Sequence, residues 1–513
     1  MSTDKPTPRP ETIATAIVAG MVMASHLAFV LLDGRLPADL NEAHKQIPEL
    51  ARGLTEQGDW GAVLLHAALE PAGWYQLAML LPGALGIPPL LAFFTINLLS
   101  LSAVLGGVAL VARRTLGPTG GLLAVSLAAS CPGLTTQARL AWIHFPELAL
   151  LMVILMVLSW DPALRRTGSA VVIGVSALLI LSLRPSGIIW LTTLAPSIGA
   201  ALWLGLPSPG GGRRAALVGW GVLIGALPLL GTIEHYTTSK IEMLGHYEHL
   251  MTASSLLQQT LHQLGLPLTG LGLLGVTYLL FVHPRKWSSL VVTLYTWLLL
   301  PIALYFVFQA GLDNFPMMTV AFALVAAAGL VRIEPRLAWV QAGLAVLSIA
   351  GAWLPDALAP QFVPKPVLSY LRYFEEGVEN YDRVFDDLPG QEILSLVHDA
   401  CGPRAGDAPC HVTVDHSLFQ PFAEEPGHFE LFLAGERSLT LTRADDLDLG
   451  TREGMPHVLA SYACPQHEDI WYTKHPEIAR RMEWLESRAT LDIVHSRMVA
   501  GGCSFELYTV TPL

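Results

Sequence analysis

The sequence predicts a mainly α-helical, polytopic membrane bundle followed by an external C-terminal α+β domain. The 513-residue chain is 52% hydrophobic and only 14% charged, whereas a soluble domain usually has about 25% charged residues. The charge is also uneven, because residues 1–354 hold 16 acidic and 18 basic residues and residues 355–513 hold 26 and 12. Neither part has the basic surface of a nucleic-acid-binding protein.

The apolar runs set the number of spans. A spanning helix needs about 20 apolar residues, within a range of about 17–25. Residues 1–354 contain eleven such runs and are therefore expected to form the transmembrane domain. The first run is long enough to remain as a spanning helix rather than a cleaved signal peptide. The expected spans are 12–32, 89–112, 119–136, 142–160, 168–183, 186–206, 215–233, 265–282, 287–309, 315–332 and 336–354.

Basic residues predict the orientation of these spans. Lys and Arg collect in short cytoplasmic loops, and here they occupy every second connection. The N-terminus is then cytoplasmic, and loop 33–88 and the domain 355–513 are external. Because Arg outnumbers Lys in an Ala-, Gly- and Leu-rich chain, we expect a multi-pass protein of a bacterial inner membrane with a periplasmic C-terminal domain. The basic connections are Arg113-Arg114, Arg165-Arg166, Arg213-Arg214, Arg285-Lys286 and Arg332 with Arg336.

Cysteine positions agree with an external tail. Cys131 lies in an apolar run, and the other four cysteines all follow residue 354: Cys401, Cys410, Cys464 and Cys503. An even number in an external domain allows two disulfides in three connectivities. Cys401 and Cys410, nine residues apart, can close a small loop. Four free thiols in a cytoplasmic tail are the alternative.

The tail is long enough for one compact domain of mixed structure. Short apolar runs predict strands, and amphipathic patterns predict helices. The predicted strands are 411–414, 429–433, 439–441 and 505–510, and the predicted helices are 367–385 and 476–488.

The first external loop contains the leading catalytic candidates. Asp39 and Glu42 lie within four residues of each other, and His44 and Lys45 follow. One interpretation is a capping box, in which the first residue caps a helix and the fourth reaches back to it. The other is a general base that takes a proton from an acceptor hydroxyl. The residues alone leave both open.

A second group of candidates lies near the expected fourth span. Arg139, His144 and Glu147 occur within nine residues. Ionisable groups inside a span are costly and usually face a cavity or a partner. A helix-end acid that pairs with Arg139 and is favoured by the helix dipole explains Glu147 equally well. Arg184 ends the fifth span, where it suits a phosphate ligand or extends to lipid headgroups.

Other sequence patterns exclude several classes of protein. The chain has no phosphate-binding Gly-rich loop and no nucleophile elbow, which argues against a nucleotide-driven pump or a dinucleotide enzyme. His246 and His249 are spaced for one helix face, but no third ligand has metal-site spacing. We assign no metal or cofactor and leave a divalent metal open.

The order of short motifs resembles the GT-C membrane glycosyltransferases, the group of protein O-mannosyltransferases and aminoarabinose lipid A transferases. The resemblance covers about residues 12–205. It departs from the family where Asn41 replaces the first acid of the usual pair and where Pro48 interrupts the loop helix. The matching segments are Asn41–Ala43, Gly58–Trp60, Glu70–Tyr75, Gly86–Leu90, Arg114–Gly117, Arg139 with Glu147, and Leu183–Gly187.

This resemblance implies an inverting glycosyltransferase. Its donor would be a sugar linked to polyprenyl phosphate, and its acceptor a lipid, glycan or protein at the external membrane face. Glu42 would be the base, with Asp39 as a possible second carboxylate. Glu147 and His144 would assist, and Arg184 would contact the phosphate. Besides membrane lipids, no further partner is implied.

Two other functions remain compatible with the sequence. A transporter or flippase of lipid-linked sugars should show inverted repeats with broken helices, which the sequence does not clearly show. A non-catalytic membrane scaffold would instead bind a partner through the acidic tail.

Overall fold

The computed structural model divides into two compact units. The described residues between 9 and 351 belong to the first, apart from 32–33, 61, 78 and 89–92, and the described residues from 390 onward belong to the second. The predicted boundary at residues 354/355 lies outside the described residues and stays a prediction. The structure describes residues 9–33, 61, 64–65, 73–75, 77–78, 89–138, 144–183, 187–227, 261, 264, 271–278, 294–297, 299–300, 315–351, 390–402, 410–414, 439–443, 455–463, 476–498 and 504–513.

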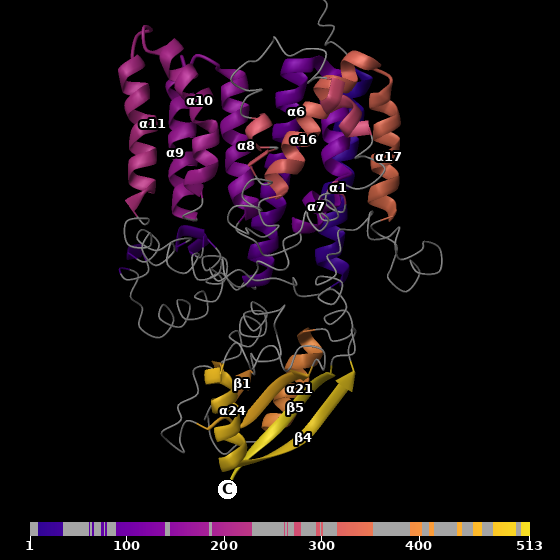
Figure 1. Ribbon diagram of the computed structural model, residues 1–513, viewed down its shortest axis with the longest axis vertical. Coiled ribbons are helices and arrows are strands. Elements are labelled where there is room, and N and C mark those ends of the chain that lie inside the picture. Colours follow the sequence, from indigo (N-terminus) through magenta and orange to yellow (C-terminus); the bar gives the residue numbers. More distant parts are fainter. Residues whose placement is uncertain are drawn as a thin grey trace, which may run out of the picture. The chain divides into compact units, whose positions relative to one another are not determined.

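The first unit is a bundle of apolar helices (Figure 1). Its helices follow the expected spans closely where these are described. They are α1 (Pro10–Asp33), α6 (Pro89–Ala129), α7 (Pro132–Gln137), α8 (His144–Trp160), α9 (Thr167–Leu183), α10 (Gly187–Gly205), α11 (Gly211–Gly225), α16 (Phe315–Ile333) and α17 (Leu337–Gly351).

Helix α6 consists of two helices that meet at Gly117. Gly117 has a φ of 83°, a conformation open to glycine, and Pro118 follows without an N–H to continue the first helix. The predicted separation into spans 89–112 and 119–136 is therefore confirmed. The second span was predicted too long, because helix α6 ends at Ala129 and Pro132 begins the separate helix α7.

Length and composition support a membrane location for part of the bundle. Among the described helices, Thr95–Ala129 and Gly187–Gly205 are long and apolar enough to cross a membrane. Four shorter apolar helices accompany them: Phe145–Trp160, Thr167–Leu183, Met317–Ile333 and Leu337–Ala350. The count of eleven spans stays a prediction.

Glycines allow two helices of the bundle to touch. A Cβ on Gly221 of α11 would lie 2.1 Å from the backbone oxygen of Gly174 on α9, and one on Gly225 would lie 2.6 Å from the Cα of Leu178. Small residues that let backbones approach closely are typical of helix packing in membranes. The other side of α11 exposes large apolar side chains, among them Trp220 and Leu223.

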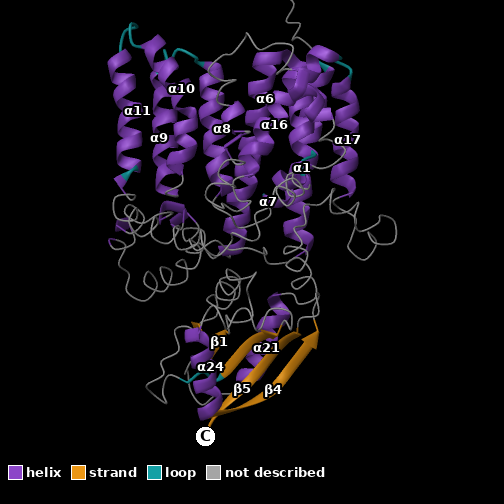
Figure 2. Ribbon diagram, viewed as in Figure 1, coloured by secondary structure: helices purple, strands orange, loops and turns teal. Residues whose placement is uncertain are grey.

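The second unit is a five-stranded mixed sheet with two helices, shown with its strands in orange in Figure 2. The strand order is β2-β1-β3-β5-β4. Strand β1 pairs in parallel with β2 and β3, and β5 pairs antiparallel with β3 and β4. The elements are α21 (Gly390–Cys401), β1 (Cys410–Val414), β2 (Leu439–Arg443), β3 (Val458–Ala463), α24 (Pro476–Arg488), β4 (Ala489–Met498) and β5 (Ser504–Pro512).

Sequence predictions for this unit were partly confirmed. The predicted strands 411–414, 439–441 and 505–510 correspond to β1, β2 and β5, and the predicted helix 476–488 is α24. Cys401 and Cys410 form the expected disulfide, which joins the end of α21 to the start of β1. Strands β3 and β4 and helix α21 were not predicted. Segments 367–385 and 429–433, Cys464 and Cys503 lie outside the described residues.

Candidate functional site

The short helix α7 is held inside the bundle by polar side chains from two other helices. His26 of α1 contacts α7 through its Nε2 atom, 2.8 Å from the backbone oxygen of Thr135. Asn97 of α6 donates through Nδ2 to the backbone oxygen of Ala138 at 3.2 Å. Both side chains are buried. These two contacts therefore fix the position of Ala138, the residue that precedes the 139–143 connection.

Glu147 lies just beyond this connection, in the first turn of α8. Its side chain is completely buried. A negative charge in this turn is favoured by the helix dipole. However, a carboxylate removed from water still needs polar or charged partners. Glu147 is thus both an acid at the start of a helix and a buried group inside the bundle. The structure therefore agrees with a helix-end acid and equally with an acid that faces a cavity or a partner.

Of the other predicted site residues, His144 is the one that belongs to a described helix. Helix α8 begins at His144, whose side chain is not described. The remaining candidates lie outside the described residues, namely Asp39, Glu42, His44, Lys45, Arg139 and Arg184. Their grouping around Glu147 therefore stays a prediction.

The described neighbours of two candidates do lie at one end of the bundle (Figure 1). Ala138 directly precedes Arg139, and Leu183, the last residue of α9, precedes Arg184. The ends of α7 and α9 lie at the same end of the bundle as the first turns of α8 and α10. The fold thus brings these chain segments to the end where Glu147 lies.

A further buried polar contact involves helix α10. The indole Nε1 of Trp297 donates to the Thr193 hydroxyl, and both side chains are buried. Sequence reasoning assigned no role to this pair, to Asn97 or to His26. The sequence signal that could have found these residues is a polar residue inside an apolar run, because such residues usually make buried contacts in membrane helices.

The described residues contain no group of three His, Cys, Asp or Glu side chains that could hold a metal ion. The acidic residues of loop 33–88 and the His246/His249 pair are outside that set. A divalent metal therefore stays open, as it did from the sequence.

Comparison with solved structures identifies the fold. The chain is similar to ArnT from Cupriavidus metallidurans bound to undecaprenyl phosphate, with a TM-score of 0.51 and 13% identity over 96% of this chain and 97% of that chain. The apo state of the same protein gives a TM-score of 0.52 and 12% identity over the same shares. No protein-family model and no curated protein sequence matches the chain. At this identity the likeness concerns the fold, and it spans both proteins almost completely.

ArnT is an aminoarabinose lipid A transferase of the GT-C group, the group whose motif order the sequence resembles. The fold that this resemblance implies is therefore confirmed. The chain has the fold of ArnT, a member of the GT-C group.

Proposed function

We propose that this protein is an integral-membrane glycosyltransferase. It moves a sugar from a polyprenyl-phosphate-linked donor to an acceptor at the external face of a bacterial inner membrane. The acceptor is a hydroxyl or other nucleophilic group of a lipid, glycan or protein. The C-terminal unit is external in this proposal.

The observation that carries the proposal is the burial of Glu147 within a fold shared with ArnT. The carboxylate lies at the start of an apolar helix, beside the segment that α7 leads into. Intramembrane acids generally mark substrate or ion pathways. The ArnT structure of the same fold contains undecaprenyl phosphate, which supports a polyprenyl phosphate as the lipid part of the donor.

The proposed reaction is a direct displacement at the anomeric carbon. Glu42 takes the proton from the acceptor hydroxyl, whose oxygen then forms a bond to that carbon. The bond between the anomeric carbon and the phosphate oxygen breaks, and polyprenyl phosphate leaves. Because bond formation and cleavage occur on opposite faces of the sugar, the configuration inverts.

The remaining candidates have supporting roles in this reaction. Arg184 and Arg139 stabilise the negative charge of the leaving phosphate, for which a guanidinium fork is well suited. Glu147 and His144 orient the reacting groups from the start of α8. Asp39 supplies the carboxylate that Asn41 lacks, and His44 and Lys45 contact the donor phosphate from the loop.

The proposal is tested with the full chain in liposomes and a panel of undecaprenyl-phosphate-linked sugars. Wild-type protein should release undecaprenyl phosphate and transfer the sugar to an envelope extract. Glu42→Gln should abolish transfer without changing folding, since loss of a general base typically costs about 10²–10⁴-fold in rate. Full activity in this variant excludes Glu42 as the base.

A second variant tests the buried acid. Glu147→Gln keeps the shape of the side chain and should reduce transfer strongly while the protein still folds. The control is Glu334→Gln in the connection between α16 and α17, because Glu334 is exposed and lies at the opposite end of the bundle (Figure 1). Equal activity of the two variants would remove Glu147 from the site.

Transport of the intact donor is the distinguishing measurement against a flippase. Liposomes loaded with labelled lipid-linked sugar should show transfer chemistry and no protein-dependent movement of the intact lipid between leaflets. Protein-dependent movement without sugar release would replace the proposed function by lipid transport.

A further inference from the structure

Three connections meet at the end of the bundle opposite to Glu147. Arg114, next to the break in α6, donates through a guanidinium nitrogen to the backbone oxygen of Trp160 at 3.2 Å. The guanidinium carbon also lies 4.8 Å from the centre of the Trp160 ring, within the range of a cation–π interaction. These contacts join α6 to the end of α8.

The connection between α8 and α9 touches the end of α10 through its backbone. A Cβ on Gly205, the last residue of α10, would lie 2.3 Å from the backbone oxygen of Ala163. Only a glycine permits this approach without displacement of the backbone. The α8–α9 connection (161–166) therefore contacts the residue at which the α10–α11 connection (206–210) begins.

Arg214 is held against the α10–α11 connection. Its side chain is only 4% exposed and donates to the Pro209 oxygen at 2.8 Å, the Gly205 oxygen at 3.2 Å and the Ser208 hydroxyl. All three partners are neutral, and the buried Nε has no partner among the described residues. A buried cation is costly without an anion, and Arg214 lies in the first turn of α11, at the positive end of the helix dipole.

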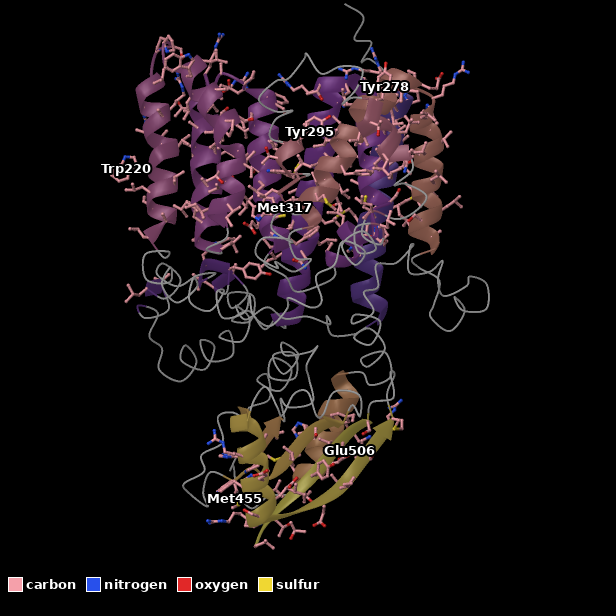
Figure 3. The ribbon with its side chains drawn as sticks, in the orientation of Figure 1. Trp220, Tyr278, Tyr295, Met317, Met455 and Glu506 are labelled. Carbon is pink, nitrogen blue, oxygen red and sulfur yellow. A yellow bond between two sulfur atoms is a disulfide. The ribbon has the colours of Figure 1, made fainter. Side chains whose placement is uncertain are left out.

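We call the arginines in or next to the three connections the arginine edge: Arg113, Arg114, Arg165, Arg166, Arg213 and Arg214. Asp161 is the one acid within 113–117, 160–168 and 205–214. Its two carboxylate oxygens already accept the backbone N–H groups of Arg165 and Arg166, each at 2.9 Å. Figure 3 shows side-chain nitrogens gathered along this end of the bundle. The arginine edge therefore carries a large excess of positive charge.

Apolar side chains border the arginine edge. Trp160 is 55% exposed, and Trp203, near the end of α10, is 76% exposed. Leu204 and Leu206 are also exposed. Tryptophan is typical of the interface between lipid headgroups and acyl chains. A ligand that fits both features has an anionic head and an apolar tail.

We propose that the arginine edge binds the phosphate headgroup of an anionic phospholipid, whose acyl chains lie against Trp203 and Leu206. Basic sites between membrane helices on the cytoplasmic side are suited to such headgroups. The site is separate from the proposed site of sugar transfer and does not depend on that reaction. The alternative is a general excess of basic residues in cytoplasmic loops, which gives positive charge at this end without a defined lipid site. The experiment distinguishes this alternative from a lipid site.

The test uses native mass spectrometry of the full chain in mild detergent. The protein is titrated with phosphatidylglycerol or with phosphatidylcholine of the same acyl chains. Wild-type protein should bind phosphatidylglycerol at least tenfold more tightly. Arg166→Gln combined with Arg213→Gln should weaken that binding about 25-fold, since each arginine near an anionic lipid contributes about fivefold. Both arginines are exposed, so the fold should persist.

The matched control removes the same charge from the same end of the bundle but outside the arginine edge. Arg332→Gln combined with Arg336→Gln, on the α16–α17 connection, should change phosphatidylglycerol binding less than twofold. An equal loss in both double variants would show general surface charge and overturn the proposal. So would equal affinity for the two lipids. Displacement of the bound lipid by glycerophosphoglycerol or inorganic phosphate would identify a soluble anion site and overturn the lipid assignment.

Discussion

The imidazole of His26 connects two helices that are far apart in the sequence, because its Nε2 atom lies 2.8 Å from the backbone oxygen of Thr135. The Nδ1 atom lies 2.9 Å from the oxygen of Val22, one turn earlier in α1. A neutral imidazole has one N–H and donates to one of these carbonyls. In the tautomer with the hydrogen on Nε2, the ring donates to Thr135 and holds α7 in place ahead of the 139–143 connection.

Replacement of His26 by Ala should destabilise the bundle. The substitution leaves the Thr135 carbonyl without this contact in a partly buried environment, which costs about 1 kcal/mol. Thermal unfolding of the purified protein in detergent measures the effect as a lower midpoint. Ser102→Ala is the control, because the Ser102 hydroxyl of α6 makes a weak contact at 3.5 Å with the sulfur of Met23, which lies on α1 as His26 does. A midpoint unchanged in His26→Ala contradicts the structural role.

Two glycines of α11, two residues apart, should respond in opposite ways to the same substitution. In Gly221→Ala the new Cβ would lie 2.1 Å from the Gly174 oxygen, so α11 must move away from α9. Overpacking of this kind costs about 1–3 kcal/mol. In Gly219→Ala the Cβ meets nothing within 4 Å, and helix propensity favours Ala by about 1 kcal/mol.

The midpoints of thermal unfolding should therefore decrease in Gly221→Ala and stay equal or increase in Gly219→Ala. Because both variants add one methyl group to the same helix, hydrophobicity cannot explain a difference between them. Similar midpoints would mean that the α9–α11 contact is looser than the structure shows.

The helices could be predicted because apolar length and basic loops are local signals. The contacts between helices could not. His26 was visible in the sequence as a polar residue in a span, but its partner Thr135 is 109 residues away. Likewise, Gly221 and Gly174 are ordinary small residues until the distance between α9 and α11 is known.

The missed elements of the C-terminal unit have a different cause. Strand β3 lies inside the sheet between β1 and β5, and such strands lack the alternating pattern of half-exposed strands. Strand β4 is at the edge and carries Asp492, His495 and Arg497, so its composition resembles a loop. For the candidate site, Glu147 was predicted because its sequence position alone shows an acid within a span.

Asp161 should make stability depend on pH in the acid range. It lies in the connection between α8 and α9, outside the helices. Burial raises the pKa of its carboxyl, but backbone hydrogen bonds from Arg165 and Arg166, the Ser169 hydroxyl and the charge of Arg166 lower it more, so the pKa lies below the ordinary 3.8. The ionised form is therefore favoured in the folded state. Its contribution is complete above about pH 5 and is lost as the pH falls through the lowered value.

The variant Asp161→Asn tests this dependence. It should lower stability at neutral pH by about 1 kcal/mol, the typical net contribution of one hydrogen bond, because the amide offers one acceptor oxygen to the two backbone N–H groups of Arg165 and Arg166. The difference from wild type should shrink steadily below about pH 4. Asp492→Asn, at an exposed position of β4, serves as the control and should leave the unfolding curve unchanged at each pH. A difference between wild type and Asp161→Asn that grows on acidification would contradict the assigned direction.

The Cys401–Cys410 disulfide should stabilise the C-terminal unit without affecting the helical bundle. The two cysteines are nine residues apart, and closure of so short a loop contributes about 2–3 kcal/mol by reducing the entropy of the unfolded chain. In the full chain with both cysteines replaced by Ser, hydrogen exchange should become faster in α21 and β1. Exchange in α16 provides the internal control, because it belongs to the other compact unit. Faster exchange in α16 as well would show that the two units unfold together, whereas unchanged exchange in β1 would mean that the disulfide adds nothing to this sheet.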